Sequence, residues 1–111
     1  MASARSVEVT FKNQTHSVLT LTAANLSHGI WTVSPPARIK PDRIVHFSSE
    51  SSGIGTGTEG TATYQHENLT ATVHLHWDNP FVGSNSYGAS VSDPIWHRVF
   101  STGDGTETTR L

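Results

Sequence analysis

Cysteine is absent from this sequence of 111 residues. Its absence excludes a disulfide framework, a thiolate metal site and a cysteine nucleophile. Charge is also scarce, because charged residues make up 14% of the chain and the formal net charge is -2. The seven Lys and Arg residues are scattered, whereas a nucleic-acid interface needs grouped cations to neutralise phosphates. The chain must therefore fold on a hydrophobic core without covalent cross-links, and we expect no nucleic-acid partner.

Long apolar runs are missing as well. No run approaches the ~20 apolar residues that a membrane-spanning helix needs, and residues 1–6 lack the apolar segment of a signal peptide. We therefore expect synthesis in the cytoplasm and, for action at a membrane surface, release by a non-classical route. Helical periodicity is missing too, because no stretch of ten or more residues repeats apolar side chains at i, i+3, i+4 and i+7.

The sequence does contain apolar residues that alternate with polar ones. Val7, Val9 and Phe11 alternate in this way near the start of the chain, and residues 71–77 do so again. A period of two predicts strands with one apolar face. The predicted strands cover residues 7–12, 18–24, 30–33, 43–48, 61–66, 70–77, 86–91 and 95–101, with a last strand at 106–111. We expect residues 7–24 to form one hairpin and residues 61–77 another.

Turn residues separate these strands. In Ile39-Lys-Pro-Asp42 the ring of Pro41 presets its backbone angle and Asp42 can cap the turn. Residues 49–60 are small, polar and rich in glycine, which predicts a loop. About eight short strands at this spacing indicate a sandwich or barrel, and the length is close to the commonest domain size. We therefore predict that residues 1–111 form a single compact antiparallel β-sandwich.

The seven histidines raise the question of a metal site. His74 and His76 lie two residues apart on one predicted strand, so their imidazoles share a face. Further ligands would have to come from His46, His66 or Glu67. The alternative, which we favour, is that a half-exposed face in a protein of low charge carries histidine as readily as threonine. We therefore predict neither a metal nor any other cofactor.

Signatures of catalysis are also missing. Gly53-x-Gly-x-Gly57 is not followed by the Gly-Lys-Ser/Thr that completes a phosphate-binding loop. No serine lies in a nucleophile elbow, and the carboxylates are dispersed along the chain. The sequence therefore predicts a binding protein and not an enzyme.

Aromatic residues give the clearest indication of what is bound. Trp31, Trp77 and Trp96 are accompanied by Phe81 and Tyr87, which lie in or beside a predicted loop. Amphipathic rings suit a membrane interface or the face of a sugar. The strand phase of Trp77 favours the core. Phe81 follows a proline in a polar loop and is the best candidate for an exposed anchor.

Three segments occur in an order that is typical of one family. They are Ile-Lys-Pro-Asp at 39–42, Gly-Thr-Glu-Gly-Thr at 57–61 and Trp-Asp-Asn-Pro-Phe-Val-Gly-Ser-Asn at 77–85. Together they resemble the aegerolysins, small acidic β-sandwich proteins of fungi and bacteria. The resemblance covers most of residues 5–90, and the tryptophan segment is its most specific part.

The resemblance implies a β-sandwich like that of the actinoporins and a role in lipid binding. Members of the family bind membrane lipids, notably sphingolipids, alone or with sterol. Some members recruit a larger perforin-type partner that makes the pore. The resemblance therefore implies a sphingolipid- or sterol-containing bilayer as the binding partner and a place in a haemolytic or pore-forming system.

Candidate site residues follow from the resemblance and from the aromatic residues. Those that match the tryptophan-loop motif of the family are Trp77, Asp78, Pro80, Gly83 and Asn85. Those added as aromatic candidates for lipid or ligand contact are Trp31, Phe81, Tyr87 and Trp96. The sequence departs from the family pattern at Asn79, where members often have cysteine, and at Thr56, where they often have an acidic residue.

Two alternatives to lipid binding use the same residues or the same fold. A carbohydrate-binding lectin would stack a sugar on a tryptophan face, with Asp78 and Asn85 bonding to its hydroxyls. A self-assembling module would pair exposed edge strands, which few lysines protect here. A chain of this kind would be a homodimer, whereas the lipid-binding and lectin hypotheses are compatible with a monomer.

Overall fold

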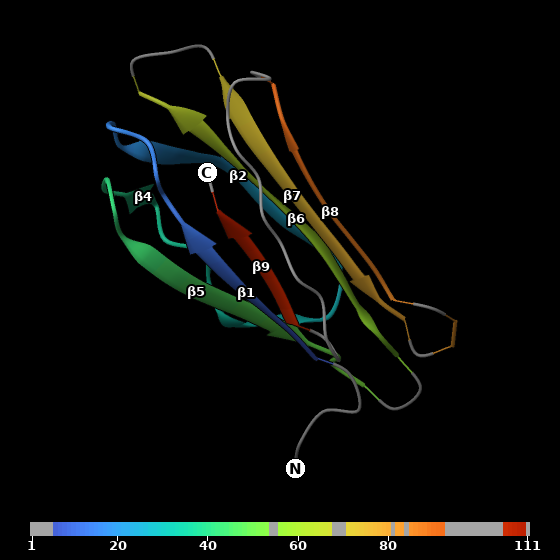
Figure 1. Cartoon of the computed structure of the whole chain (residues 1–111). Coiled ribbons are helices and arrows are strands. Elements are labelled where there is room, and N and C mark those ends of the chain that lie inside the picture. The colour runs from blue at the N-terminus through green and yellow to red at the C-terminus, as the bar shows by residue number, and fades with distance from the viewer. Residues whose placement is uncertain are drawn as a thin grey trace.

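Two β-sheets face each other across the core of the protein (Figure 1). The computed structural model describes residues 6–53, 56–67, 71–80, 82–83, 85–92 and 106–110. The strands are β1 (Ser6–Lys12), β2 (Leu19–His28), β3 (Ile30–Val33), β4 (Arg38–Ile39), β5 (Ile44–Glu50), β6 (Thr58–His66), β7 (Thr72–Asn79), β8 (Ser86–Val91) and β9 (Thr106–Arg110). One sheet has the order β3-β5-β1-β9 and the other the order β4-β2-β6-β7-β8. The predicted all-β sandwich is confirmed.

The described part of the chain contains strands, turns and loops. No helix there is long and apolar enough to cross a membrane.

The alternation in the sequence sets the inner faces of the two sheets. Val7, Val9 and Phe11 of β1 are at most 1% exposed, and Trp77 of β7 is equally buried. The Trp77 ring lies 5.8 Å from the ring of Phe47 in β5, measured between centroids. Burying a side chain of this size stabilises the fold by ~1.5–3 kcal/mol. Among the described residues, the buried core consists of Val7, Val9, Phe11, Leu19, Ile39, Phe47, Ala62, Tyr64, Val73, Leu75, Trp77 and Ala89.

The predicted hairpin over residues 7–24 is wrong. β1 pairs with β5 on one side and with β9 on the other, whereas β2 pairs with β4 and β6 in the second sheet. Residues 13–18 therefore carry the chain from one sheet to the other and do not form a hairpin turn. A period of two identifies a strand and its apolar face, but it does not identify the neighbouring strand.

The second predicted hairpin is confirmed. β6 and β7 are antiparallel, and Thr58 pairs with Asn79 at one end and Gln65 with Thr72 at the other. The predicted strand at 86–91 is β8, and β9 lies within the predicted strand at 106–111. β9 runs parallel to β1, which the sequence did not indicate. The strand predicted at 95–101 lies outside the described residues.

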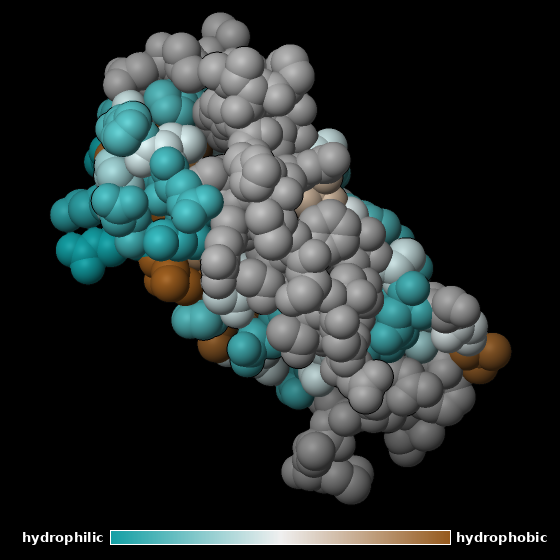
Figure 2. All heavy atoms as spheres, in the orientation of Figure 1, coloured by the Kyte–Doolittle hydropathy of each residue, from teal (hydrophilic) through white to brown (hydrophobic). Residues whose placement is uncertain are grey.

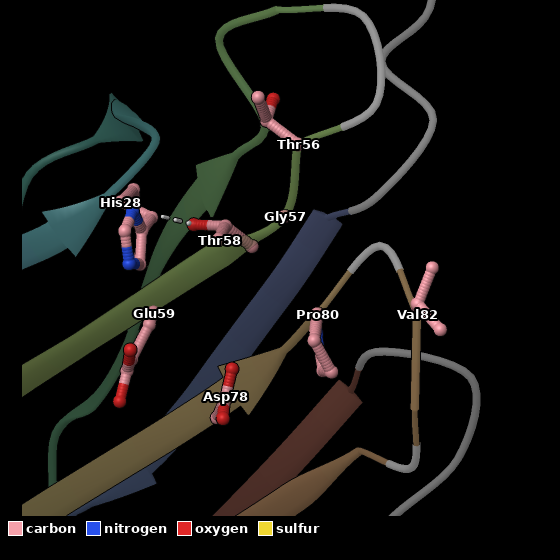
Figure 3. A pocket seen from close by; sticks show the side chains of 8 residues that line it. All are labelled: His28, Thr56, Gly57, Thr58, Glu59, Asp78, Pro80 and Val82. Carbon is pink, nitrogen blue, oxygen red and sulfur yellow. Dashed lines mark hydrogen bonds between the residues drawn. The ribbon is translucent and has the colours of Figure 1, made fainter.

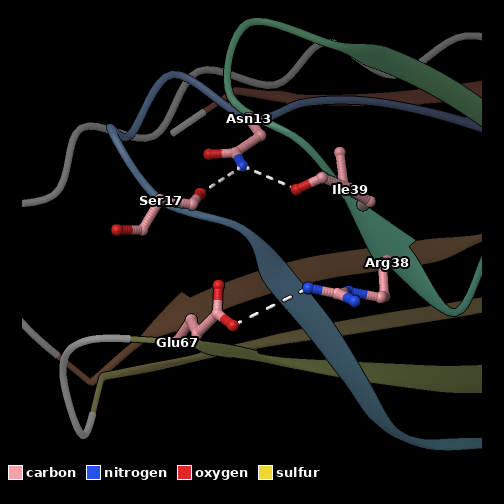
Figure 4. Close-up of polar contacts among 5 residues, drawn as sticks. All are labelled: Asn13, Ser17, Arg38, Ile39 and Glu67. Atoms are coloured by element: carbon pink, nitrogen blue, oxygen red, sulfur yellow. Dashed lines mark hydrogen bonds and ion pairs between the residues drawn. The ribbon is translucent and has the colours of Figure 1, made fainter.

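Asn13 organises one end of the sandwich, which we call the Asn13 end (residues 13–18 and 39–43). Its side chain is fully buried, and its Nδ2 donates to the carbonyls of Ser17 and Ile39 at 2.8 and 2.9 Å (Figure 4). Its Oδ1 accepts from the amide and the hydroxyl of Thr15 at 3.0 and 2.7 Å. Each polar atom of a buried amide is thereby satisfied.

The turn after β4 is tied to the same residue. The Asp42 amide donates to the Asn13 carbonyl at 2.7 Å, and the Arg43 amide donates to the Lys40 carbonyl at 3.2 Å. Asp42 has a φ of 63°, so a turn with Pro41 before it has the geometry of type II. Arg38 and Glu67 form an exposed ion pair nearby, at 3.7 Å (Figure 4).

Irregular pairing interrupts two strands that lie at or near the sheet edges. β2 has register shifts after Leu21 and after Leu26, and β3 has one after Trp31. β3 is an edge strand, and β4 covers β2 at Leu19 and Thr20 alone. Bulges twist an edge away from further pairing, which protects it where lysine does not.

Candidate functional site

A pocket opens at the end of the sandwich opposite Asn13, where β2 and β7 end and β6 begins (Figure 3). Its volume is about 460 Å³, and it is open to solvent. We call it the end pocket and call this end of the sandwich the pocket end. The lining residues are His28, Thr56, Gly57, Thr58, Glu59, Asp78, Pro80 and Val82.

Two acidic side chains face each other in this pocket. Glu59 pairs with Asp78 across β6 and β7, and His28 pairs with Glu59 across β2 and β6. Paired residues of neighbouring strands point to the same face, and like charges placed directly opposite destabilise a sheet. Among the described residues, no Lys or Arg lines the pocket and neither carboxylate forms an ion pair. The pocket is therefore suited to a group that carries positive charge.

An apolar side chain stands beside the acidic pair. Val82, in the loop between β7 and β8, is 82% exposed and lines the pocket together with Pro80 (Figure 3). Gly83 follows with a φ of 111°, a conformation that glycine adopts without strain. Figure 2 shows apolar surface in brown at the lower right, the end of the molecule where this loop lies in Figure 1. An exposed valine beside a charged pocket has no role in packing.

Behind the pocket runs a chain of buried hydrogen bonds. The indole Nε1 of Trp77 donates to Ser49 Oγ at 3.1 Å, and Ser49 Oγ lies 2.7 Å from Thr58 Oγ1. Thr58 Oγ1 in turn donates to the His28 carbonyl at 3.3 Å. Ser49, Thr58 and Trp77 are each 1% exposed. The chain links β7, β5, β6 and β2, so it joins the two sheets directly behind the pocket.

The tryptophan-loop residues predicted from the sequence separate into lining and support. Asp78 and Pro80 line the end pocket, and Gly83 forms the bend after Val82. Asn85 is exposed and precedes β8. Trp77 lies in the core, because its position on β7 puts it on the inner face with Leu75. Its contribution to a ligand site is therefore indirect.

The aromatic candidates have different positions. Trp31 is half-buried and packs edge-on against Trp77, with ring centroids 5.8 Å apart. The backbone of Tyr87 lies in β8 and pairs with Trp77. Phe81 and Trp96 lie outside the described residues. Phe81 therefore remains a prediction, although it stands in the chain between Pro80 and Val82, which both line the pocket.

Six of the described lining residues were not predicted as site residues from the sequence: His28, Thr56, Gly57, Thr58, Glu59 and Val82. His28 and Glu59 reach the pocket through the pairing of β2 with β6, and that pairing has no local signal. Val82 stands within the tryptophan segment, and its place before a glycine in a polar loop could have marked it. Thr56, which stands where the family often has an acidic residue, bonds through its hydroxyl to the Gly53 carbonyl at 2.7 Å.

The histidines considered as metal ligands are divided between the two sheets. His46 belongs to β5 and His74 to β7, so they are in opposite sheets. His46 Nδ1 lies 3.0 Å from the Thr10 hydroxyl, and His74 Nδ1 lies 2.9 Å from the Thr63 hydroxyl. In the part of the chain that the structure describes, no three His, Asp or Glu residues are grouped so as to hold a metal ion.

Comparisons with known proteins agree with this architecture. A family model described as Aegerolysin matches residues 4–109. An uncharacterized protein of Dictyostelium discoideum is 34% identical over 62 residues, which is 56% of this chain and 6% of that protein. The crystal structure of the lipid binding protein Nakanori superposes with a TM-score of 0.72 at 18% identity, over 95% of this chain and 68% of that one. At this identity the structural likeness shows the fold.

Proposed function

This chain belongs to the aegerolysin family, and we propose that it binds membrane lipids through its pocket end. The observation that carries the proposal is Val82, which is 82% exposed beside an open pocket with two carboxylates. An apolar tip next to a polar pocket fits the boundary between acyl chains and headgroups. The structural neighbour Nakanori is itself called a lipid binding protein, which supports the same role.

Val82 alone is too small to hold the protein on a membrane. Burying one valine contributes ~1.5–3 kcal/mol at most, whereas micromolar binding needs about 8 kcal/mol. Ile30 begins β3 directly after the His28–Gly29 turn and is 49% exposed, so it offers a second apolar contact at this end. The predicted anchor Phe81 would be a third. Headgroup contacts in the pocket must supply the remainder.

Glu59 and Asp78 indicate which headgroups these are. The described residues that line the pocket include two carboxylates and no Lys or Arg. The pocket therefore favours a headgroup with an ammonium group and disfavours one with net negative charge. Phosphocholine and phosphoethanolamine carry such a group. We therefore extend the proposal to sphingolipids with these headgroups, in membranes with or without sterol.

A perforin-type partner is part of the same proposal. With the pocket end on the membrane, such a partner would have to bind a sheet face or the Asn13 end. The lectin alternative is less well supported. It assigned sugar stacking to a tryptophan face, and Trp77 is 1% exposed while Trp31 packs against it.

Vesicle flotation tests the proposal. We expect the protein to float with vesicles that contain sphingomyelin, alone or with cholesterol, and to remain behind with phosphatidylserine vesicles. Val82→Asp should reduce flotation about tenfold, since it places a charge on the inserting side chain. Ile44→Asp is the matched control, because Ile44 is 54% exposed at the opposite end of the sandwich.

Two results would decide against lipid binding. One is indifference to sphingolipid, sterol and anionic vesicles alike. The other is an equal loss of flotation in Val82→Asp and Ile44→Asp, which would remove the pocket end as the docking surface. Binding on a glycan array without lipid dependence would favour the lectin instead.

A further inference from the structure

We infer that Thr58 is a positioning residue of the end pocket, holding in place the wall that carries His28. This inference rests on the proposed function for its ligand but on geometry for its mechanism. Thr58 is counted among the pocket residues although it is 1% exposed. It therefore lies beneath the lining and acts on a ligand only through the residues above it.

The direction of the hydrogen bonds behind the pocket is fixed by their donors. The carbonyl of His28 has no hydrogen, so Thr58 donates its own to that oxygen. The Thr58 oxygen must then accept from the hydroxyl of Ser49, and Ser49 accepts from the Trp77 indole. Each hydroxyl thus donates once and accepts once. A buried network satisfied in this way is rigid.

The last acceptor in this series of hydrogen bonds is the His28 carbonyl. It lies where the backbone leaves one sheet for the other. β2 ends at His28 after a register shift, and β3 begins at Ile30 in the other sheet. Gly29 between them has a φ of 97°, and a Cβ there would come within 2.6 Å of Thr58 Oγ1 and 2.5 Å of the Glu50 carbonyl. The turn is therefore packed directly on Thr58, and the threonine hydroxyl sets its position.

Loss of the Thr58 hydroxyl should move the side of the pocket formed by His28, which we call the His28 wall. It should leave the opposite side, which includes Val82 and which we call the Val82 wall, unchanged. Asp78, Pro80 and Val82 come from β7 and its loop, whereas the Thr58 hydroxyl bonds to Ser49 of β5 and to the His28 carbonyl of β2. His28 is bound to Thr58 through its carbonyl (Figure 3). The distance between the His28 wall and the Val82 wall then determines how well a headgroup fits.

Three variants separate positioning from stability. Thr58→Val keeps the shape and removes the bond to His28, whereas Thr58→Ser keeps the hydroxyl. Ser49→Ala removes the acceptor of the Trp77 indole but leaves Thr58 free to donate to His28. All are compared well below their unfolding temperatures, with sphingomyelin–cholesterol vesicles as the probe. We expect Thr58→Val to weaken binding about tenfold, Thr58→Ser to bind within about twofold of the unaltered protein, and Ser49→Ala to lose stability while retaining binding.

A second readout does not depend on lipid. The ¹³C shift of the His28 carbonyl, and the amide shifts of Gly29 and Ile30, should change in Thr58→Val and not in Ser49→Ala. Thr58→Ala replaces Thr58→Val if the latter does not fold. Equal binding by Thr58→Val and the unaltered protein, or unchanged His28 shifts, would overturn the inference. If the unaltered protein binds no vesicle, the proposed function fails, and the carbonyl shift still decides whether Thr58 positions the turn.

Discussion

The two ends of the sandwich are built on opposite principles. At the Asn13 end a buried side chain bonds to three residues in two segments of the chain, and both of its polar atoms are satisfied. At the pocket end two like charges face each other, a valine is exposed and a pocket of about 460 Å³ stays open. The first arrangement stabilises the fold. The second is costly to the fold, and such costs gather at binding sites.

Removing the Asn13 side chain should destabilise the fold and leave the pocket end unchanged. Asn13→Ala removes a donor to the Ile39 and Ser17 carbonyls and the acceptor of the Thr15 amide. We expect it to lower the free energy of unfolding by about 3 kcal/mol, measured by urea denaturation. Vesicle binding per folded molecule should be unchanged. A loss of binding in the folded fraction would show that the two ends are not independent.

Neutralising Glu59 and Asp78 should weaken vesicle binding and leave the stability of the fold intact, the reverse of what is expected for Asn13→Ala. Glu59→Gln together with Asp78→Asn removes the repulsion between neighbouring strands, so stability should be kept or should rise slightly. Binding to sphingomyelin vesicles should fall about tenfold, and discrimination against phosphatidylserine should narrow. Glu8→Gln, an exposed carboxylate in the other sheet, is the control. Equal binding by the double variant and the control would show that the carboxylates do not contact the headgroup.

Tyr64→Phe should have the smallest effect on the free energy of unfolding. It tests a hydrogen bond in the core between the two ends. Its hydroxyl donates to the Pro36 carbonyl at 2.8 Å, and Tyr64→Phe should cost about 1 kcal/mol. Burial raises the pKa of the Tyr64 hydroxyl above its ordinary value. Its contribution to stability is therefore complete at neutral pH and is lost as pH rises above about 10, because the unfolded chain releases the proton first.

The difference in stability between Tyr64→Phe and the unaltered protein isolates the contribution of the Tyr64 hydroxyl. Stability curves measured from pH 8 to 11 should converge for Tyr64→Phe and the unaltered protein as the pH rises. Parallel curves over that range would contradict the assignment of the raised pKa to Tyr64.

Strands and their buried faces could be predicted from the sequence, whereas the pairing of strands could not. The alternation along Val73, Leu75 and Trp77 identified both a strand and its buried face, because that pattern depends on local chain geometry. The same reasoning failed for β1 and β2. Their patterns are equally clear, but their partners lie far away in the sequence, and local alternation does not specify which sheet a strand enters.

The residues of the candidate site fall into the same two groups, those set by local sequence and those set by strand pairing. Asp78 and Pro80 belong to a contiguous motif, so the sequence could indicate them. His28 and Glu59 meet Asp78 through pairing of three strands, and no spacing in the sequence encodes that pairing. Thr58 was least accessible to prediction. Its role depends on a carbonyl thirty residues away in the chain, and the residue type alone is typical of any exposed strand.

The parallel pairing of β1 with β9 has a consequence for the order of assembly. Glu8 lies beside Thr106 in this pair, so one neighbour of β1 is synthesised much later than β1 itself. β1 can pair with β5 while the chain is still emerging from the ribosome, but its other side stays open until residues beyond 105 have followed. Closing a loop of this length is slow. During that interval the growing chain exposes a strand rich in valine and phenylalanine, and it is then that capture by a chaperone or aggregation competes with folding.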